Sequence, residues 1–202
     1  MDAVISATNE QKQLLQDNGI SSFIGKSSTS NGITVTAGQT IVDNYFAYLT
    51  FEVEGYIPED EYQPDFMDMK IRIDGKEPEA SFSSGFLSDS DRHDGILEYN
   101  IMMMMSAEKG YFSGKPVHIE FNNMGHYMEK AGDLTLDTTG TWTFDWAFGS
   151  ADMTESFELN AELGDTDVSV LHAELSPISV NITYDAPGND KTAPPQFIGI
   201  RR

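Results

Sequence analysis

The sequence contains no cysteine, and its apolar runs are short. The absence of cysteine excludes disulfides, cysteine-ligated zinc sites and thiol nucleophiles. The longest apolar run, residues 101–105 (IMMMM), is far shorter than the roughly 20 residues that a membrane-spanning helix requires. A chain of 202 residues can bury a sizeable core, so we expect it to fold by burial of apolar side chains alone.

Positive charge is also scarce. Twelve Lys and Arg face 33 Asp and Glu, which gives a formal net charge of −21, and residues 131–190 contain twelve acidic residues and no Lys or Arg. Such a surface repels phosphate backbones and anionic lipid headgroups, so we do not expect this segment to bind nucleic acid or a membrane surface. The acidic residues are compatible with simple solubility, with loose binding of divalent cations, or with attraction to a basic partner.

Alternating apolar and polar residues are abundant. In residues 140–148 (GTWTFDWAF), the rings of Trp142, Phe144, Trp146 and Phe148 alternate with small or polar residues. A period of two places all four rings on one face of a β-strand. We interpret this face as the core of an antiparallel β-sandwich, and the alternative is an exposed platform on which sugars stack.

About ten short strands separated by turn residues predict an all-β fold with helices incidental. The predicted strands are residues 33–42, 45–54, 67–73, 82–87, 96–105, 116–121, 141–148, 155–163, 168–175, 178–184 and 196–200. A single helix is predicted at residues 6–17, ended by Asn18-Gly19. Residues 25–32 are predicted to form a polar loop, and residues 122–139 a turn-rich segment.

These elements suggest three parts. Residues 1–26 are predicted to form an N-terminal helix or stalk, and residues 27–150 the sandwich. Residues 151–202 supply further strands, either in the same sandwich or at the start of a second, possibly truncated, β domain. The composition changes near residues 149–154, which is where the boundary is placed.

One acidic loop could bind calcium. Asp89, Asp91 and Asp94 lie close together before Gly95, and clustered carboxylates before a glycine can wrap a calcium ion. The EF-hand pattern fails, because its twelfth position falls on Asn100 instead of a bidentate glutamate. The alternative is a solvated turn that leads into the next strand.

The four histidines do not form a recognisable metal motif. They are His93, His118, His126 and His172, and none belongs to an HxH or HxxxH pair. We expect His118 to lie on the surface of a strand and His172 to be exposed at a sheet edge. A zinc site would require the four side chains to converge in space.

Catalytic signatures are missing from the sequence. There is no GxSxG motif and no glycine-rich phosphate loop. Among 33 acidic residues some pair always has a plausible spacing, so an acid pair of the glycosidase kind carries no weight. We assign no catalytic, cofactor-binding or metal-ligating residues and expect a protein that is not an enzyme.

The methionine-rich run allows two interpretations. In a strand, Ile101, Met103 and Met105 point to one side, and Met102 and Met104 to the other. A central strand covered on both faces is the first interpretation, because methionine fills irregular gaps in a core. The second is an adaptable apolar patch for a protein partner.

Three segments resemble the extracytoplasmic domain of membrane-anchored anti-sigma factors of Gram-positive bacteria, a family of domains of unknown function. They are NGITVTAGQTIVDNYFAYLTFEVEG (residues 31–55), GTWTFDWAF (residues 140–148) and ELNAELGDTDVSVLHAELSPISVNITYD (residues 158–185). The resemblance covers most of residues 17–185 and depends on the order and spacing of the segments. It implies an immunoglobulin-like sandwich that follows a transmembrane helix lying outside this chain.

The resemblance also implies a function. The domain would lie on the outer side of the membrane, respond to an unidentified envelope ligand or protein partner, and change how tightly a cytoplasmic domain holds a sigma factor. No cofactor and no catalytic residue follow from it, and the oligomeric state stays open.

The alternative is a surface or secreted β-sandwich module that binds glycans or calcium. Such a module would display exposed aromatic rings beside ordered carboxylates. Outside residues 142–148, the best candidates for exposed rings are Tyr45, Tyr48, Tyr56 and Tyr62.

Overall fold

The computed structural model describes residues 9–57, 63–87, 95–105, 107–127, 133–150, 152–164 and 167–186. Its elements are α1 (Asn9–Asp17), β1 (Ser21–Ser30), β2 (Ile33–Val42), β3 (Phe46–Glu54), β4 (Gln63–Ile73), β5 (Ser81–Phe86), β6 (Ile96–Met104), β7 (Pro116–Tyr127), β8 (Leu134–Ala147), β9 (Glu155–Glu162), β10 (Ser169–Leu175) and β11 (Val180–Asp185). The chain divides into two compact units. Unit 1 comprises Met1–Met153 with Pro177–Ser179, and unit 2 comprises Thr154–Ser176 with Val180–Arg202.

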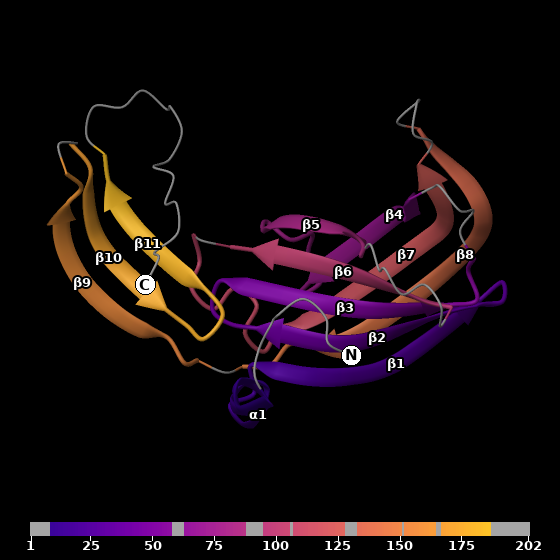
Figure 1. The fold of residues 1–202 in the computed structure, drawn as a ribbon, viewed down its shortest axis with the longest axis horizontal. Coiled ribbons are helices and arrows are strands. Elements are labelled where there is room, and N and C mark those ends of the chain that lie inside the picture. The colour runs from indigo at the N-terminus through magenta and orange to yellow at the C-terminus, as the bar shows by residue number, and fades with distance from the viewer. Residues whose placement is uncertain are drawn as a thin grey trace. The chain divides into compact units, whose positions relative to one another are not determined.

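Unit 1 is an antiparallel sandwich of a five-stranded and a three-stranded sheet (Figure 1). The strand orders are β1-β2-β3-β6-β5 and β4-β7-β8. Without β1, the orders β2-β3-β6-β5 and β4-β7-β8 are the ABED and CFG orders of a constant-type immunoglobulin domain. The predicted immunoglobulin-like β-sandwich with a short N-terminal helix is therefore confirmed, and β1 is an additional strand at its edge.

The core of the sandwich contains the aromatic residues of β8. Trp142, Phe144 and Phe148 are buried, and Trp146 is half-buried against the same cluster. The indole Nε1 of Trp142 donates a hydrogen bond of 3.0 Å to the carbonyl oxygen of Ile33, at the start of β2. The core interpretation of these rings is therefore correct. A sugar-stacking platform at this strand is wrong, because its rings are covered by the opposite sheet.

The methionine-rich strand β6 lies between β3 and β5. Ile101, Met103 and Met105 are buried in the main core, as predicted. On the other face Met102 packs against a second, smaller cluster, but the Met104 side chain is 54% exposed. The strand is thus central, with full cover on one face and partial cover on the other.

The second cluster packs helix α1 against the outer face of the large sheet. It contains Leu15, Ile20, Ile41 and Tyr48. The helix ends where predicted, since Gly19 adopts a φ of 69° after the last turn. The predicted residues 6–8 lie outside the described part of the chain.

Tyr48 of this cluster was predicted to be exposed, but its side chain is buried. Burial raises the pKa of Tyr48 to about 12. Among the described residues, its hydroxyl has no hydrogen-bond partner.

The segment predicted as a polar loop, residues 25–32, is instead part of strand β1 and of the turn that follows it. Asn31 and Gly32 have φ angles of 49° and 81°, which suit a two-residue type I′ hairpin turn. Hydroxyl pairs such as Ser27–Thr36 and Thr29–Thr34 hydrogen-bond between the two strands. Sequence polarity was misleading here, because cross-strand hydroxyl pairs stabilise this strand instead of apolar contacts.

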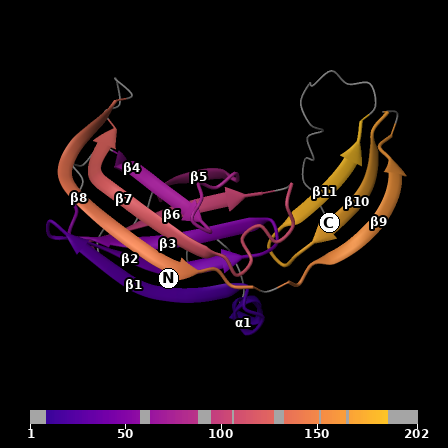
Figure 2. The same ribbon diagram turned by 180° about the vertical axis from the view of Figure 1, so that it is seen from behind.

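Strands β1 and β8 close one side of the sandwich, where the edges of the two sheets meet (Figure 2). Three side chains make the connection: Asn31 Nδ2 donates to Thr138 Oγ1 at 2.8 Å, Ser30 Oγ accepts from the Thr141 amide at 3.2 Å, and Lys26 Nζ donates to the carbonyl oxygen of Asp145. These bonds join the additional strand to the opposite sheet.

Strands β7 and β8 extend beyond their predicted limits. Residues 122–127 and 134–139 were assigned to a turn-rich segment, but they continue the two strands of a long hairpin. The pairing register shifts between Asn122 and Met124 and again between Met124 and Gly125. These irregularities break the period of two on which strand prediction depends.

Unit 2 contains one antiparallel sheet of three strands in the order β11-β10-β9. Its strands agree with the predicted residues 155–163, 168–175 and 178–184 to within two residues. His172 lies on the central strand β10, so the prediction that it sits at a sheet edge is wrong. The predicted strand at residues 196–200 lies outside the described residues.

Among the described residues, no helix combines the length and the hydropathy that a membrane-spanning segment requires.

Candidate functional site

Most candidate metal ligands of the sequence lie outside the part of the chain that the structure describes. Asp89, Asp91, Asp94 and His93 all lie outside the described residues. Within the described ranges, no group of three or more His, Asp or Glu side chains has a geometry that could hold a metal ion.

Two of the remaining histidines are each paired with acidic side chains. His118 of β7 lies on the surface, as predicted, with Nδ1 2.8 Å from the Asp145 carboxylate. His172 of β10 lies 3.2 Å from Glu158 through Nδ1 and 3.9 Å from Glu174 through Nε2. His126 is less exposed than both, because it belongs to a partly buried polar cluster.

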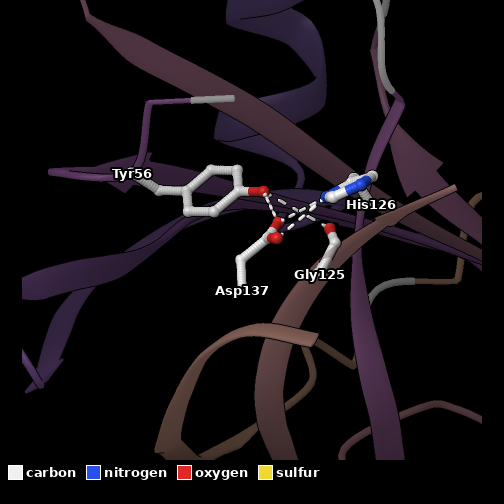
Figure 3. Close-up of polar contacts among 4 residues, drawn as sticks. All are labelled: Tyr56, Gly125, His126 and Asp137. Atoms are coloured by element: carbon white, nitrogen blue, oxygen red, sulfur yellow. Dashed lines mark hydrogen bonds and ion pairs between the residues drawn. The ribbon is translucent and has the colours of Figure 1, made fainter. Parts of the chain in front are cut away.

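This cluster consists of Tyr56, His126 and Asp137 and lies at the bulged end of the β7–β8 hairpin (Figure 3). The hydroxyl of Tyr56 donates to Asp137 Oδ2 at 2.5 Å and lies 3.4 Å from the carbonyl oxygen of Gly125. The Nδ1 of His126 lies 2.8 Å from Asp137 Oδ1 and 2.9 Å from Oδ2. Because an ionised carboxylate only accepts hydrogen bonds, both neighbours donate to Asp137.

Three separate chain segments supply the cluster. Tyr56 follows the end of β3 in the large sheet, His126 lies near the end of β7, and Asp137 lies near the start of β8. The side chains of His126 and Asp137 are only 13% and 28% exposed, and Tyr56 is buried. One carboxylate therefore fastens the end of β3 to the hairpin of the opposite sheet.

The bulges place Asp137 within reach of both donors. Gly125 pairs with Leu136, Met124 pairs with Thr138, and Asp137 between them has no partner in the ladder. A bulge of this kind redirects a side chain that regular pairing would point elsewhere. The next irregularity contains Asn123, whose φ is 53° and whose Oδ1 accepts a hydrogen bond from the Gly140 amide at 3.1 Å.

A half-buried carboxylate, that of Asp65, lies next to this cluster. Asp65 of β4 pairs in the ladder with Gly125, and its carboxylate accepts hydrogen bonds from the hydroxyls of Tyr99 and Tyr127. The Phe66 amide also donates to Asp65 Oδ1 at 2.8 Å. Burial raises the pKa of Asp65 above its ordinary value, and these hydrogen bonds partly offset that rise. Burial likewise raises the pKa of Tyr99.

Together these groups place two carboxylates, three phenols and one imidazole at one end of the sandwich. Partly buried titratable groups are a feature of functional sites, but structural networks produce the same pattern. These groups can exchange protons with solvent. Their hydrogen bonds also hold the end of β3 against β7 and β8.

A third polar site lies in the loop between β2 and β3. Asp43 and Asn44 are both buried, and Asp43 Oδ1 accepts from the Tyr45 amide at 2.8 Å. Asp43 Oδ2 accepts from Ser179 Oγ at 2.5 Å, and Asn44 Nδ2 donates to Asp152 Oδ1 at 2.8 Å. The predicted Asp43-Asn44 turn therefore exists, and it also binds two distant segments within unit 1.

The Tyr56–Asp137–His126 cluster was not predicted from the sequence. His126 and Asp137 lie in the segment predicted to be turns, and Tyr56 was expected to be an exposed ring. The sequence did contain one signal, the Gly125-His126 pair, which lies close to the polar residue Asp137 on the next strand. This signal can be interpreted only when the pairing of β7 with β8 is already known.

Comparison with known proteins shows that the fold of this chain is similar to that of a solved structure. No family model and no curated protein matches the chain. The chain is similar to a solved structure, the conserved domain protein from Bacillus anthracis, with a TM-score of 0.53 and 17% sequence identity. The match covers 84% of this chain and 57% of that one, so this chain spans little more than half the length of its structural neighbour.

Proposed function

We propose that this chain is the extracytoplasmic, non-catalytic sensor domain of a membrane-anchored anti-sigma factor of a Gram-positive bacterium. The observation that carries the proposal is the order and spacing of the three segments that resemble that family: residues 31–55, 140–148 and 158–185. In the protein that we propose, a helix outside this chain anchors the domain, and a cytoplasmic domain outside it binds the sigma factor.

The positions of the three segments support this assignment. Residues 31–55 form β2 and β3, the first two strands of the immunoglobulin-like order, and residues 140–148 include the end of its last strand β8. Residues 158–185 include most of the sheet of unit 2. Each segment thus corresponds to regular structure, and the first two contribute to one core.

The polar clusters give the proposal a physical mechanism. A signal can pass through a domain only if the ligand binds one of two states more tightly than the other. The Tyr56–Asp137–His126 cluster joins the two sheets, so a ligand or partner that displaced it would favour a state with a looser β7–β8 hairpin. The expected output is a change in the affinity of the cytoplasmic domain for its sigma factor.

The proposal is tested in cells with a reporter gene that depends on the cognate sigma factor. The complete protein is compared with a variant that lacks residues 21–186, at equal protein levels by immunoblot. We expect the deletion to change basal reporter activity or to abolish its response to envelope stress. Unchanged activity under all conditions would contradict a sensor role. Reporter fusions that place residue 1 in the cytoplasm would contradict the proposed location.

The alternative, a glycan-binding module, has less support. The rings of Trp142, Phe144 and Phe148 that would have formed its platform are buried in the core. Tyr48 and Tyr56 are also buried, and Tyr62 lies outside the described residues.

A further inference from the structure

The three-stranded sheet of unit 2 has one apolar face and one polar face. The cross-strand row Phe157–Ala173–Ile182 is apolar, and Leu175 lies directly opposite Val180 in the neighbouring row on the same side. Leu159 follows two residues after Phe157 on β9. We call these six residues the unit 2 apolar face.

The opposite face of the sheet is polar and internally paired. Its rows are Glu158–His172–Thr183 and Ser156–Glu174–Asn181. His172 contacts Glu158 at 3.2 Å, and Ser156 Oγ donates to Glu174 at 3.1 Å. An antiparallel sheet with this division normally turns its apolar face toward a covering layer.

The outer part of the apolar face lacks that cover. Ala173 at its centre is buried and Ile182 is half-buried, but Phe157 is 40% exposed, Leu159 49%, Leu175 40% and Val180 58%. In unit 1, by contrast, the corresponding inward residues of β3, such as Leu49, Phe51 and Val53, are fully buried. A contiguous exposed apolar surface rimmed by polar residues is typical of an interaction site.

The negative charge of unit 2 favours a basic partner. The sequence from residue 154 to residue 185 contains seven acidic residues and no Lys or Arg. Of these, Glu158 and Glu174 lie on the polar face, and Glu155 lies opposite Leu175 at the border of the apolar face. A second copy of this chain would bring the same negative charges against it, whereas a basic partner would be attracted.

The dimensions of the sheet suit one helix. Three strands at a spacing of about 4.8 Å span roughly 10 Å between the outer strand axes. An α-helix with its side chains has a diameter of about 10–12 Å. One amphipathic helix laid across the sheet can therefore cover the apolar face and bring a basic side chain over Glu155.

We propose that the unit 2 apolar face docks a basic amphipathic helix of a partner protein. Leucine-type side chains of that helix would contact Phe157, Leu175 and Val180, and its flanking lysines or arginines would face Glu155. This docking does not depend on the anti-sigma proposal and goes beyond it.

The experiment measures binding of a defined probe to the 202-residue protein. The probe is a fluorescein-labelled amphipathic helical peptide of leucine and lysine, about 18 residues long, and binding is followed by fluorescence anisotropy in ~0.15 M salt. Leu175→Asp is compared with Thr183→Asp, an exposed position on the polar face. Each substitution adds one negative charge, and circular dichroism checks that both variants remain folded.

Docking at the apolar face and simple charge attraction predict different effects of Leu175→Asp. Charge attraction alone would leave the binding of the cationic peptide unchanged or make it tighter, whereas docking weakens it. We expect Leu175→Asp to weaken binding about tenfold or more, because a charge replaces apolar contact, and Thr183→Asp to change it less than about twofold. Val180→Asp should reproduce the loss. Equal or tighter binding by Leu175→Asp, or no binding by the wild-type protein, would overturn the proposal. Self-association in sedimentation that Leu175→Asp abolishes would also overturn it, since the face would then bind a second copy.

Discussion

The carbonyl oxygen of Thr135 lies 2.0 Å from the position that a Cβ atom on residue 125 would occupy, so only glycine fits at Gly125. The close approach occurs where the β7–β8 hairpin bulges and where the Gly125 carbonyl oxygen faces the Tyr56 hydroxyl. The absence of a side chain at one residue therefore permits the geometry of the whole Tyr56–Asp137–His126 cluster.

Replacing this glycine tests that dependence. Gly125→Ala should lower the free energy of unfolding by about 3 kcal/mol, because the new methyl group must displace backbone that cannot yield cheaply. The matched control is Gly85→Ala in β5, where no atom lies within 4 Å of the new Cβ and no positive φ is required. The control should change stability by less than about 0.5 kcal/mol in urea denaturation. Equal effects at the two positions would show that the close contact is relieved at little cost.

Removing the shared carboxylate should also destabilise unit 1. Asp137→Ala leaves the buried Tyr56 hydroxyl and the His126 imidazole without this acceptor, at a cost of about 1–3 kcal/mol. Asp145→Ala is the control, since Asp145 also pairs with a histidine but its side chain is 73% exposed. We expect the control to cost no more than about 0.5 kcal/mol in the same denaturation experiment. A cost as small at Asp137 would mean that the cluster does not fasten the two sheets.

The sequence predicted most of this fold because alternation is regular where one face is buried. Strands β2, β3 and β6 matched their predicted limits closely, since each places a continuous apolar row in the core. β1 was missed because hydroxyl pairs, not apolar contacts, join it to β2. The candidate site was missed for a related reason. Its two bulges change the side-chain parity, and a bulge depends on the partner strand as much as on its own residues.

The two tryptophans of β8 should respond differently to substitution. Trp142→Phe leaves the Ile33 carbonyl oxygen without its indole donor and opens space in the core, so we expect a loss of about 2–3 kcal/mol. Trp146 Nε1 is buried without a hydrogen-bond partner among the described residues. Trp146→Phe removes that unsatisfied donor, so its loss should stay below about 1 kcal/mol. Thermal and urea unfolding of both variants measures the difference, and the reverse order would contradict the contacts described.

Asp65 should make stability depend on pH in a defined direction. Its pKa is raised in the folded protein from an ordinary value of 3.8, so near that value the folded state binds more protons than the unfolded state. Stability then falls as pH rises from about 4 through the raised pKa, because the half-buried carboxylate becomes charged. Asp65→Asn removes this charge, so its stability relative to wild type should increase over the same pH window and level off above it. Urea denaturation at a series of pH values measures the difference, and a difference that decreases with rising pH would contradict this account.

The connection between β1 and β8 has a consequence for aggregation. Terminal strands of a sheet expose unpaired backbone groups that can recruit a strand from another molecule. On the closed side, β1 and β8 lie against each other through three side-chain bridges. On the open side, β5 is only six residues long, and β4 carries the exposed charged side chains of Asp68, Lys70 and Arg72. Short length and edge charges both discourage strand addition, so the sandwich of unit 1 presents few sites for edge-to-edge polymerisation.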